Sequence, residues 1–306
     1  MKKIIILTTI FIFFAGCTIA PLVANGTVKQ KITILEQKRL YFDNRGDIPF
    51  EGVSDLDYDI KNHKLYMIGD RGYLYVFDAY FNKKIEKLKY IDAFHIKTPK
   101  GRIVHPDIEG LTHNPKGELI SSFEQRPRVK KITKTGKLQS NYKIPKKLQK
   151  KSIYKSSNSM FEGITYHPKY GILVATEYPI NREKNTHQTI YSLKGKEWHF
   201  KAEKYPNSAV TALEVMDDGN IILIERAYNG LSNPFYITLK KVYLNRCNKK
   251  RECKSEVLAT FSSDDGWGYN NFEGLAKVGK NRFVMVSDNN GRSFVPTVFT
   301  YFKVNR

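Results

Sequence analysis

Short runs of apolar and β-branched residues alternate with short polar turns along most of this chain, and helical periodicity is almost absent. The turns are rich in Gly, Pro, Asn and Asp, as in the segments 114–117 and 217–220. Apolar runs such as 221–224 and 282–286 follow them directly. Tight hairpin turns and buried strands prefer these residue types. The pattern therefore predicts an all-β fold built from hairpins.

A short motif recurs within this pattern: an acid, a glycine and an aliphatic residue, then a turn, then an apolar strand that ends in a second acid. The first acids of the four complete copies are Glu51, Glu109, Glu162 and Glu273. The second acids are Asp70, Glu124, Glu177 and Asp288. A fifth, degenerate copy has Thr211 and Glu225 in these places. The copies are spaced by roughly 50 to 60 residues, about one four-stranded propeller blade with a loop insertion.

Two further strand-like segments, 31–40 and 298–304, belong to no complete copy of the motif. We expect them to pair with each other and to close a ring of blades. The sequence thus predicts a single all-β propeller over residues 31–306, with six blades and with five or seven as alternatives.

The first residues indicate export. Met1-Lys2-Lys3 precedes an apolar stretch at 4–15, which has the length of a signal-peptide core and is too short to span a bilayer. Phe14-Ala15-Gly16-Cys17 resembles a bacterial lipobox. We predict a signal peptide at 1–16, lipidation of Cys17 and a linker to residue 30, with plain cleavage near Ala20 or Ala24 as the alternative. The protein is then lipid-anchored in the bacterial cell envelope, on the periplasmic face or the outer surface.

The other two cysteines, Cys247 and Cys253, flank a short polar stretch that is typical of a loop tip. In an oxidising compartment they should form a disulfide.

Lys and Arg outnumber Asp and Glu by 51 to 30, which gives a net charge of +21. The field of such a chain attracts phosphates and acidic lipids. The segment 126–155 holds much of this charge and no acid. We interpret its second half as a surface insertion, either a solvated loop or a contact with an anionic leaflet.

The sequence lacks the nucleophile elbow of α/β-hydrolases, the His-Glu-x-x-His zinc motif, a Walker-type loop and a dinucleotide fingerprint. These classes of enzyme are therefore not indicated. We expect the partner to be an anionic small molecule or a lipid headgroup, with no nucleic acid, and the protein to be a monomer.

The first acids suggest a metal site. A Glu that recurs once per blade at the start of an inner strand points toward the axis, where the copies would form a ring. Carboxylates that lie this close need a counter-ion to stay ionised, and Ca²⁺ prefers oxygen ligands. We therefore predict a Ca²⁺ site made of Glu51, Glu109, Glu162 and Glu273. The alternative is that each Glu only caps backbone amides in its turn.

The second acids suggest catalysis. Each is followed within five residues by an arginine, and these are Arg71, Arg126, Arg182, Arg226 and Arg292. An arginine can hold a phosphate while carboxylates or their metal polarise a leaving oxygen. We predict catalytic roles for Asp70, Glu124, Glu177 and Asp288, and substrate binding by Arg71, Arg126, Arg226 and Asn289. The alternative is a set of ordinary surface ion pairs.

One histidine is a candidate general acid. His105 stands just before the acidic step at 107–109 and could donate a proton to a leaving group. A purely structural role is the alternative.

Taken in order and spacing, the motifs at 51–54, 69–72, 107–111, 123–126, 162–164, 271–275 and 287–291 resemble those of the phytase-like propeller family described as having esterase-like activity. The resemblance covers roughly residues 45–302 and implies an exported propeller that binds calcium and hydrolyses phosphoesters or esters. Thr211 departs from the pattern. The acid-Gly-aliphatic steps are also similar to those of calcium-dependent lactonase propellers.

Two classes of function follow. The first is a metal-assisted hydrolase of a phosphoester or ester, with a calcium-dependent lactonase as a variant. The second is a non-enzymatic envelope propeller that binds an anionic ligand, since a fold does not dictate a function.

Overall fold

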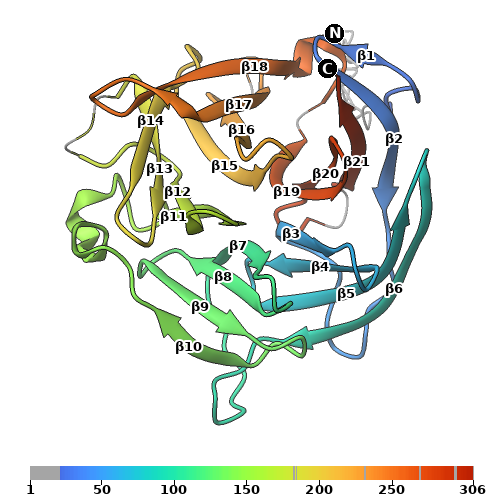
Figure 1. The fold of residues 1–306 in the computed structure, drawn as a ribbon. Coiled ribbons are helices and arrows are strands. Elements are labelled where there is room, and N and C mark those ends of the chain that lie inside the picture. The colour runs from blue at the N-terminus through green and yellow to red at the C-terminus, as the bar shows by residue number, and fades with distance from the viewer. Residues whose placement is uncertain are drawn as a thin grey trace, which may run out of the picture.

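The structure is a computed structural model and describes residues 21–181, 183, 185–230, 232–268, 270–292 and 295–305. In these residues the strands form twisted, mostly antiparallel blades around a central axis (Figure 1). Blade 1 contains β3 (Val53–Asp59), β4 (Lys64–Gly69), β5 (Tyr73–Phe81) and β6 (Ile85–His95). Blade 2 contains β7 (Ile108–His113), β8 (Leu119–Phe123), β9 (Arg128–Ile132) and β10 (Leu138–Tyr142).

The remaining strands form three blades of the same kind. Blade 3 contains β11 (Phe161–His167), β12 (Gly171–Thr176), β13 (His187–Ser192) and β14 (Glu197–Lys201). Blade 4 contains β15 (Ser208–Val215), β16 (Ile221–Ala227), β17 (Tyr236–Cys247) and β18 (Glu252–Ser262). Blade 5 contains β19 (Asn271–Gly279), β20 (Arg282–Asp288), β21 (Thr297–Val304), β2 (Ile32–Leu40) and β1 (Val28–Lys29).

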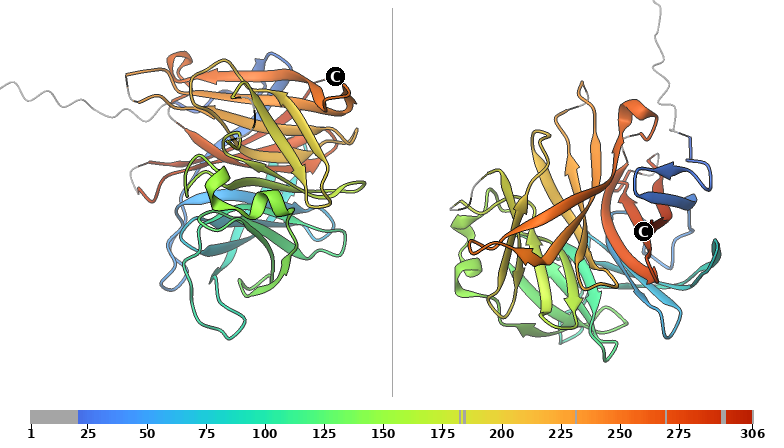
Figure 2. Two further views of the ribbon diagram at one scale, coloured as in Figure 1. Left: turned by 90° about the vertical axis from the view of Figure 1, so that its left-hand side faces the viewer. Right: turned by 45° about the horizontal axis from the view of Figure 1, so that its top comes forward.

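The ring closes through the two ends of the chain. The innermost strands touch in a circle, from β3 through β7, β11, β15 and β19 back to β3. The N-terminal strand β2 pairs antiparallel with the C-terminal strand β21, and Figure 2 shows them side by side in blue and red. The all-β propeller and the pairing of 31–40 with 298–304 are thus confirmed.

The number of blades corrects the sequence-based expectation. The terminal strands complete the blade that carries Glu273, instead of forming a blade of their own. The described residues therefore form five blades, one of the two alternatives, and not six.

Strands near the axis are buried on both faces because each blade packs between two others. Every residue of β8 and of β12 is buried, and the same holds for nearly all of β20. This packing explains why the second strand of each blade is an almost continuous apolar run in the sequence.

Bulges and glycines shape the innermost strands. All five carry a β-bulge at the same place, two residues before a recurring aliphatic residue, in β3, β7, β11, β15 and β19. A side chain on Gly110 would place its Cβ 2.6 Å from the carbonyl oxygen of Glu162, and one on Gly274 would place it 2.9 Å from the Cα atom of Asp55. The recurring glycine is therefore required by the close approach of neighbouring blades at the axis.

The basic insertion is partly anchored. Two short 3₁₀ helices, η1 (Lys146–Gln149) and η2 (Lys151–Ile153), follow blade 2, and a third, η3 (Ser263–Asp265), follows β18. Leu148 of η1 is fully buried in the same apolar cluster as Phe161 and Tyr191 of blade 3. Ile144 and Tyr154 belong to the same cluster, so the insertion is held against blade 3 by several apolar side chains. No helix in the described part of the chain is long and apolar enough to cross a membrane.

Blades 3 and 4 are joined at their outer edges, where β14 pairs in parallel with β18. The β17–β18 hairpin that supplies this edge ends in the predicted disulfide between Cys247 and Cys253, which is confirmed.

The disulfide closes only a short loop, so we expect a modest effect on stability. Replacing Cys247 and Cys253 together by Ser should lower the free energy of unfolding by about 2 kcal/mol, because a short loop restricts the unfolded chain little. Urea unfolding with and without reductant measures this. The reductant should have no effect on the double variant, and a loss far above about 4 kcal/mol would contradict the expectation.

Candidate functional site

The bulge places one side chain per blade at equivalent positions around the axis. At these bulge positions stand Ser54, Glu109, Glu162, Thr211 and Glu273. A second position recurs in the second strand of each blade, directly after the residue that pairs with the one preceding the bulge. This set is Asp70, Glu124, Glu177, Arg226 and Asp288. We call the acids of these two sets, together with Asp107, the axial cluster.

Glu51 occupies a different place from the other first acids. It lies three residues before the bulge position of blade 1, which Ser54 holds. Nη1 of Arg71 donates a hydrogen bond of 2.6 Å to Oε1 of Glu51. The bulge positions therefore hold three glutamates, Glu109, Glu162 and Glu273. The expected ring of four is corrected to these three, because Glu51 lies outside it.

The fourth blade shows a second difference of register. Glu225 pairs with Val210, so the position of the second acid belongs to the next residue, Arg226. Glu225 instead accepts a hydrogen bond of 2.7 Å from Oγ of Ser208 and forms a buried ion pair with Lys240. The fourth blade thus carries a cation where the other four carry a carboxylate.

The carboxylates of the axial cluster form two groups of three that share one member. One group is Asp107, Glu109 and Glu124, and the other is Glu124, Glu162 and Glu177. Within each group, one oxygen from each carboxylate lies within 4.8 Å of the others. Such oxygen donors fit a hard divalent cation such as Ca²⁺, which takes six to eight oxygen ligands. Asp107 was missed as a ligand candidate, although it stands only two residues before Glu109.

Burial and mutual repulsion raise the pKa values of these carboxyls. Burial is the largest cause for Glu109 and Glu162, whose pKa values lie well above the usual range, and neighbouring carboxylates add to the rise. Burial also raises the pKa of Glu124 to about 7 and that of Asp288 to about 8. Without a cation, several of these groups hold a proton at neutral pH. A bound cation would displace these protons.

Arg226 is the counter-ion inside the cluster. Its Nη1 donates to Oε1 of Glu273 at 2.6 Å and to Oδ1 of Asn271 at 2.8 Å, and its Nη2 donates to Oε1 of Glu177 at 2.9 Å. Burial lowers the pKa of Arg226, but the carboxylates of Glu273 and Glu177 raise it by more. Both terminal nitrogens are therefore engaged within the cluster, which differs from the substrate-binding role expected for this residue.

Asp70 and Asn289 differ in their surroundings. Oδ1 of Asp70 is buried and has no hydrogen-bond partner among the described residues, and burial raises the pKa of its carboxyl. Oδ1 of Asn289 accepts hydrogen bonds from the backbone N–H groups of Gly52 and Gly291, at 2.8 and 3.1 Å. Asn289 thus braces two loops beside the cluster, and Asp70 has an oxygen available for a ligand.

The other predicted residues lie at the rim. Nδ1 of His105 lies 3.0 Å from the carbonyl oxygen of Arg71, so the Nδ1–H donates and Nε2 stays available. His105, Asp107, Glu124 and Arg126 line one groove of about 620 Å³ between blades 1 and 2. The structure thus places His105, the candidate general acid, and Arg126, the candidate anion-binding residue, in the same groove as two carboxylates of the axial cluster. Arg182 and Cys17 lie outside the described residues.

One family matches most of the chain. The family model described as "Phytase-like: Esterase-like activity of phytase" covers residues 48–291. No curated protein matches the sequence.

Three solved structures show a weak similarity to this chain. The propeller domain of Cps50 (Swd1) from Myceliophteria thermophila is 9% identical, with 86% of this chain and 99% of that chain covered and a TM-score of 0.40. The PQQ-bound aldose sugar dehydrogenase from Streptomyces coelicolor is 11% identical, with 88% and 98% covered and a TM-score of 0.43. A luciferin-regenerating enzyme is 10% identical, with 82% and 91% covered and a TM-score of 0.43. These identities are too low to carry information on activity.

Proposed function

The chain belongs to the phytase-like family, and we propose that it is a metal-assisted hydrolase of a phosphoester or ester with the axial cluster as its catalytic centre. The observation that carries the proposal is the pair of carboxylate groups that share Glu124. Turn capping alone does not require the five carboxyls of these groups to converge, because burying them together without a cation raises their pKa values and costs free energy.

The residues divide between holding a cation and handling the substrate. Glu109, Glu162 and Glu124 would hold Ca²⁺, with Asp107 and Glu177 completing the two groups. A bound Ca²⁺ supplies Lewis acidity, which polarises a phosphoryl or carbonyl oxygen and lowers the pKa of bound water. Arg226 balances the charge of Glu177 and Glu273, so that the carboxylates can stay ionised next to the cation.

The groove between blades 1 and 2 places the substrate-handling groups. Arg126 is exposed at its rim and can donate a bidentate pair of hydrogen bonds to an anionic oxygen. Nε2 of His105, when protonated, can donate its proton to the leaving oxygen, because Nδ1 is already held by the carbonyl of Arg71. Asp70 and Asp288 belong to the axial cluster but to neither group of three, and they can orient the attacking water.

Hydrolysis of chromogenic substrates tests this function. We expect the purified protein to cleave bis(4-nitrophenyl) phosphate or 4-nitrophenyl esters in Ca²⁺ and to lose this activity in chelator. Glu124→Gln should reduce kcat by at least about a hundredfold, since Glu124 belongs to both carboxylate groups. Glu86→Gln on the exposed outer strand of blade 1 is the matched control and should retain full activity.

The outcomes separate the candidate functions. Cleavage of lactones alone would favour the lactonase. If no substrate is cleaved with or without Ca²⁺, the non-enzymatic binding protein becomes the better description.

We also propose that the propeller is anchored to the cell envelope by lipid on Cys17, on the basis of the apolar stretch at 4–15 and the lipobox-like 14–17. Cys17→Ala should move the protein from the membrane fraction to the soluble extracytoplasmic fraction, because two acyl chains give stable anchoring and none remain. Cys247→Ser is the control and should stay with the membrane. A Cys17→Ala protein that still needs detergent for extraction would contradict the anchor.

A further inference from the structure

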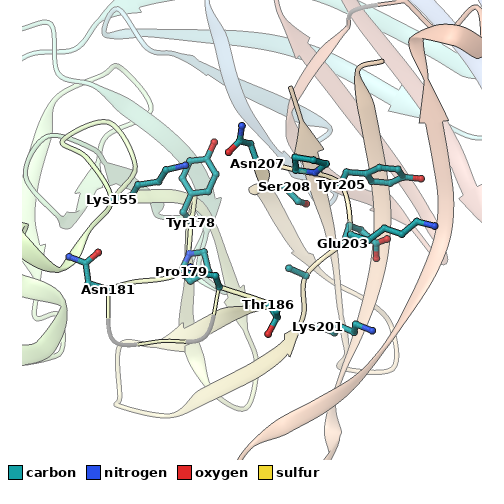
Figure 3. A pocket seen from close by; sticks show the side chains of 14 residues that line it. Lys155, Tyr178, Pro179, Asn181, Thr186, Lys201, Glu203, Tyr205, Asn207 and Ser208 are labelled. Atoms are coloured by element: carbon teal, nitrogen blue, oxygen red, sulfur yellow. The ribbon is translucent and has the colours of Figure 1, made fainter. Parts of the chain in front are cut away.

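Two grooves open beside the axial cluster at the same end of the propeller. The first, between blades 1 and 2, ends at Asp107 and Glu124 and carries Arg102, Arg126, Arg128 and Lys130. The second lies between blades 3 and 4 and measures about 860 Å³ (Figure 3). Its lining includes Tyr178, which directly follows Glu177 of the cluster, and three lysines, Lys155, Lys201 and Lys204.

The cations of the first groove have no anionic partner. Among the described residues, none of the four side chains forms an ion pair with a carboxylate. Arg128 is half-buried with its guanidinium 4.8 Å from the ring centroid of Phe123, and its Nε is buried without a hydrogen-bond partner among the described residues. Burial lowers the pKa of Arg128, and the charge of Arg126 lowers it further. An anion bound in this groove would accept a hydrogen bond from Arg128 and would offset the repulsion between Arg128 and Arg126.

The second groove is similarly cationic. Lys155 lies with its Nζ 3.6 Å from the ring centroid of Tyr178, and Figure 3 shows the two side chains together on one wall. Lys201 and Lys204 form no ion pair within the described residues. The one acid in the lining, Glu203, is already bound by Lys240 at 2.7 Å. The positive charge of this groove is therefore also uncompensated.

At the opposite end of the axis, part of the positive charge is paired with carboxylates. There, a pocket of about 450 Å³ contains Lys277, which pairs with Asp217, and His113, which pairs with Asp57. The nearby Lys134 pairs with Asp59. Lys169 of this pocket forms no ion pair among the described residues, so the two grooves differ from it in the number of unpaired cations, which is four and three against one.

We propose that the substrate is a linear polyanion whose units are joined by phosphodiester bonds, and that it lies across the mouth of the propeller with phosphates on either side of the scissile one in the two grooves. This rests on the proposed function. Blades 2 and 3 separate the two grooves, so one phosphate group cannot contact both sets of cations. A chain with repeated phosphates can, while the phosphodiester that is cleaved lies between them at the axial cluster.

The reaction on such a chain is hydrolysis. Water adds its oxygen to phosphorus, the bond from phosphorus to the leaving alkoxide breaks, and a proton passes to that alkoxide. The products are a shorter chain that ends in a phosphomonoester and one that ends in an alcohol.

Glycerol-phosphate oligomers test the proposal against a small diester. We expect the wild type to show a kcat/KM for a hexamer at least about tenfold above that for a glycerol-phosphate dimer, whose single diester has the same leaving group, with the gain in KM. The double variants Arg128→Gln/Lys130→Gln and Lys201→Gln/Lys204→Gln should each lower this ratio several-fold. The control Lys249→Gln/Lys250→Gln, at the exposed tip of the β17–β18 hairpin, should leave the ratio unchanged. Lys201 and Lys204 are exposed, so their loss does not threaten folding.

Binding provides a readout that does not depend on turnover. A fluorescent hexamer should bind the Glu124→Gln protein more weakly as salt rises, and each double variant should flatten this dependence. If the wild type cleaves the small diester but shows no preference for the hexamer, the polyanion proposal is wrong and the hydrolase stands. If nothing is cleaved but the hexamer binds in the grooves, the hydrolase fails and the polyanion remains. An unchanged ratio and unchanged binding in both double variants overturn the proposal.

Discussion

Replacing Glu109 and Glu162 together by Gln should abolish calcium binding and remove the stabilisation that calcium gives. Each residue belongs to a different carboxylate group of the axial cluster, so the double variant breaks both. Calorimetric titration with Ca²⁺ should show no binding, and the melting temperature should no longer respond to Ca²⁺. The same change should remove hydrolysis.

The metal-free protein should show the opposite effect of the same substitution. In chelator near pH 8, the double variant should be more stable than the wild type, because Gln removes two buried carboxyls whose pKa values burial raises. The gain should shrink at pH 5, where the wild-type carboxyls are protonated.

The pH dependence has a definite sign. In the unfolded chain these carboxyls lose their protons near pH 4, whereas burial raises the pKa of Glu124 to about 7 and that of Asp288 to about 8 in the folded chain. Between these values the folded state binds more protons than the unfolded state, so the free energy of unfolding falls as pH rises from about 4 to 8. Calcium should abolish this fall. A chelated protein whose stability is flat or rising over this range would contradict the buried cluster, and Glu86→Gln should behave as the wild type.

The fold followed from the sequence where local chemistry decides it. Turn residues and apolar runs indicated the hairpins, and the unassigned segments 31–40 and 298–304 correctly indicated the closure. The number of blades did not follow, because the sequence does not say whether two terminal strands form a new blade or complete an existing one. Here β20 pairs with β21, so the terminal strands join the blade of Glu273.

The axial cluster was predictable as a set of residue types but not in register. The bulge shifts each innermost strand by one residue, and only strand pairing shows that Ser54, three residues after Glu51, holds the bulge position of blade 1. Pairing likewise assigns the acid position of blade 4 to Arg226 instead of Glu225. The glycine gave no signal of this, because Gly52 follows Glu51 as a glycine follows the other three glutamates. Only the structure shows that Gly52 has a positive φ of 60° and lies before the bulge.

The grooves depend on contacts that the sequence does not reveal. Residue 102 lies between blades 1 and 2, whereas residue 128 begins strand β9 of blade 2, and the lining at 155, 178 and 204 comes from three separate loops. Whether a lysine is paired also depends on neighbours far along the chain, as Lys240 and Glu203 show. Net charge alone therefore indicated an anionic partner without indicating where it binds.

Arg226→Met should be the most destabilising single substitution at the axis. The change leaves Glu177 and Glu273 without the guanidinium that both contact, at 2.9 and 2.6 Å. Removing one partner of a buried ion pair costs about 3 to 5 kcal/mol, because the remaining charges are desolvated and unpaired. Chemical unfolding in chelator measures the loss. Arg246→Met, near the exposed C-terminal end of β17, is the matched control and should change the free energy of unfolding by less than about 1 kcal/mol.

The pairing predicts how this loss varies with conditions. It should be larger at pH 8 than at pH 5, because at pH 5 the two carboxyls can hold protons and need no counter-ion. Replacing Glu273 by Gln in the Arg226→Met protein should recover part of the stability, since one unpaired carboxyl is then removed, and calcium should recover part by supplying positive charge. Equal losses at both pH values, with no recovery in the double variant, would mean that Arg226 stabilises the axis by packing and not by its charge.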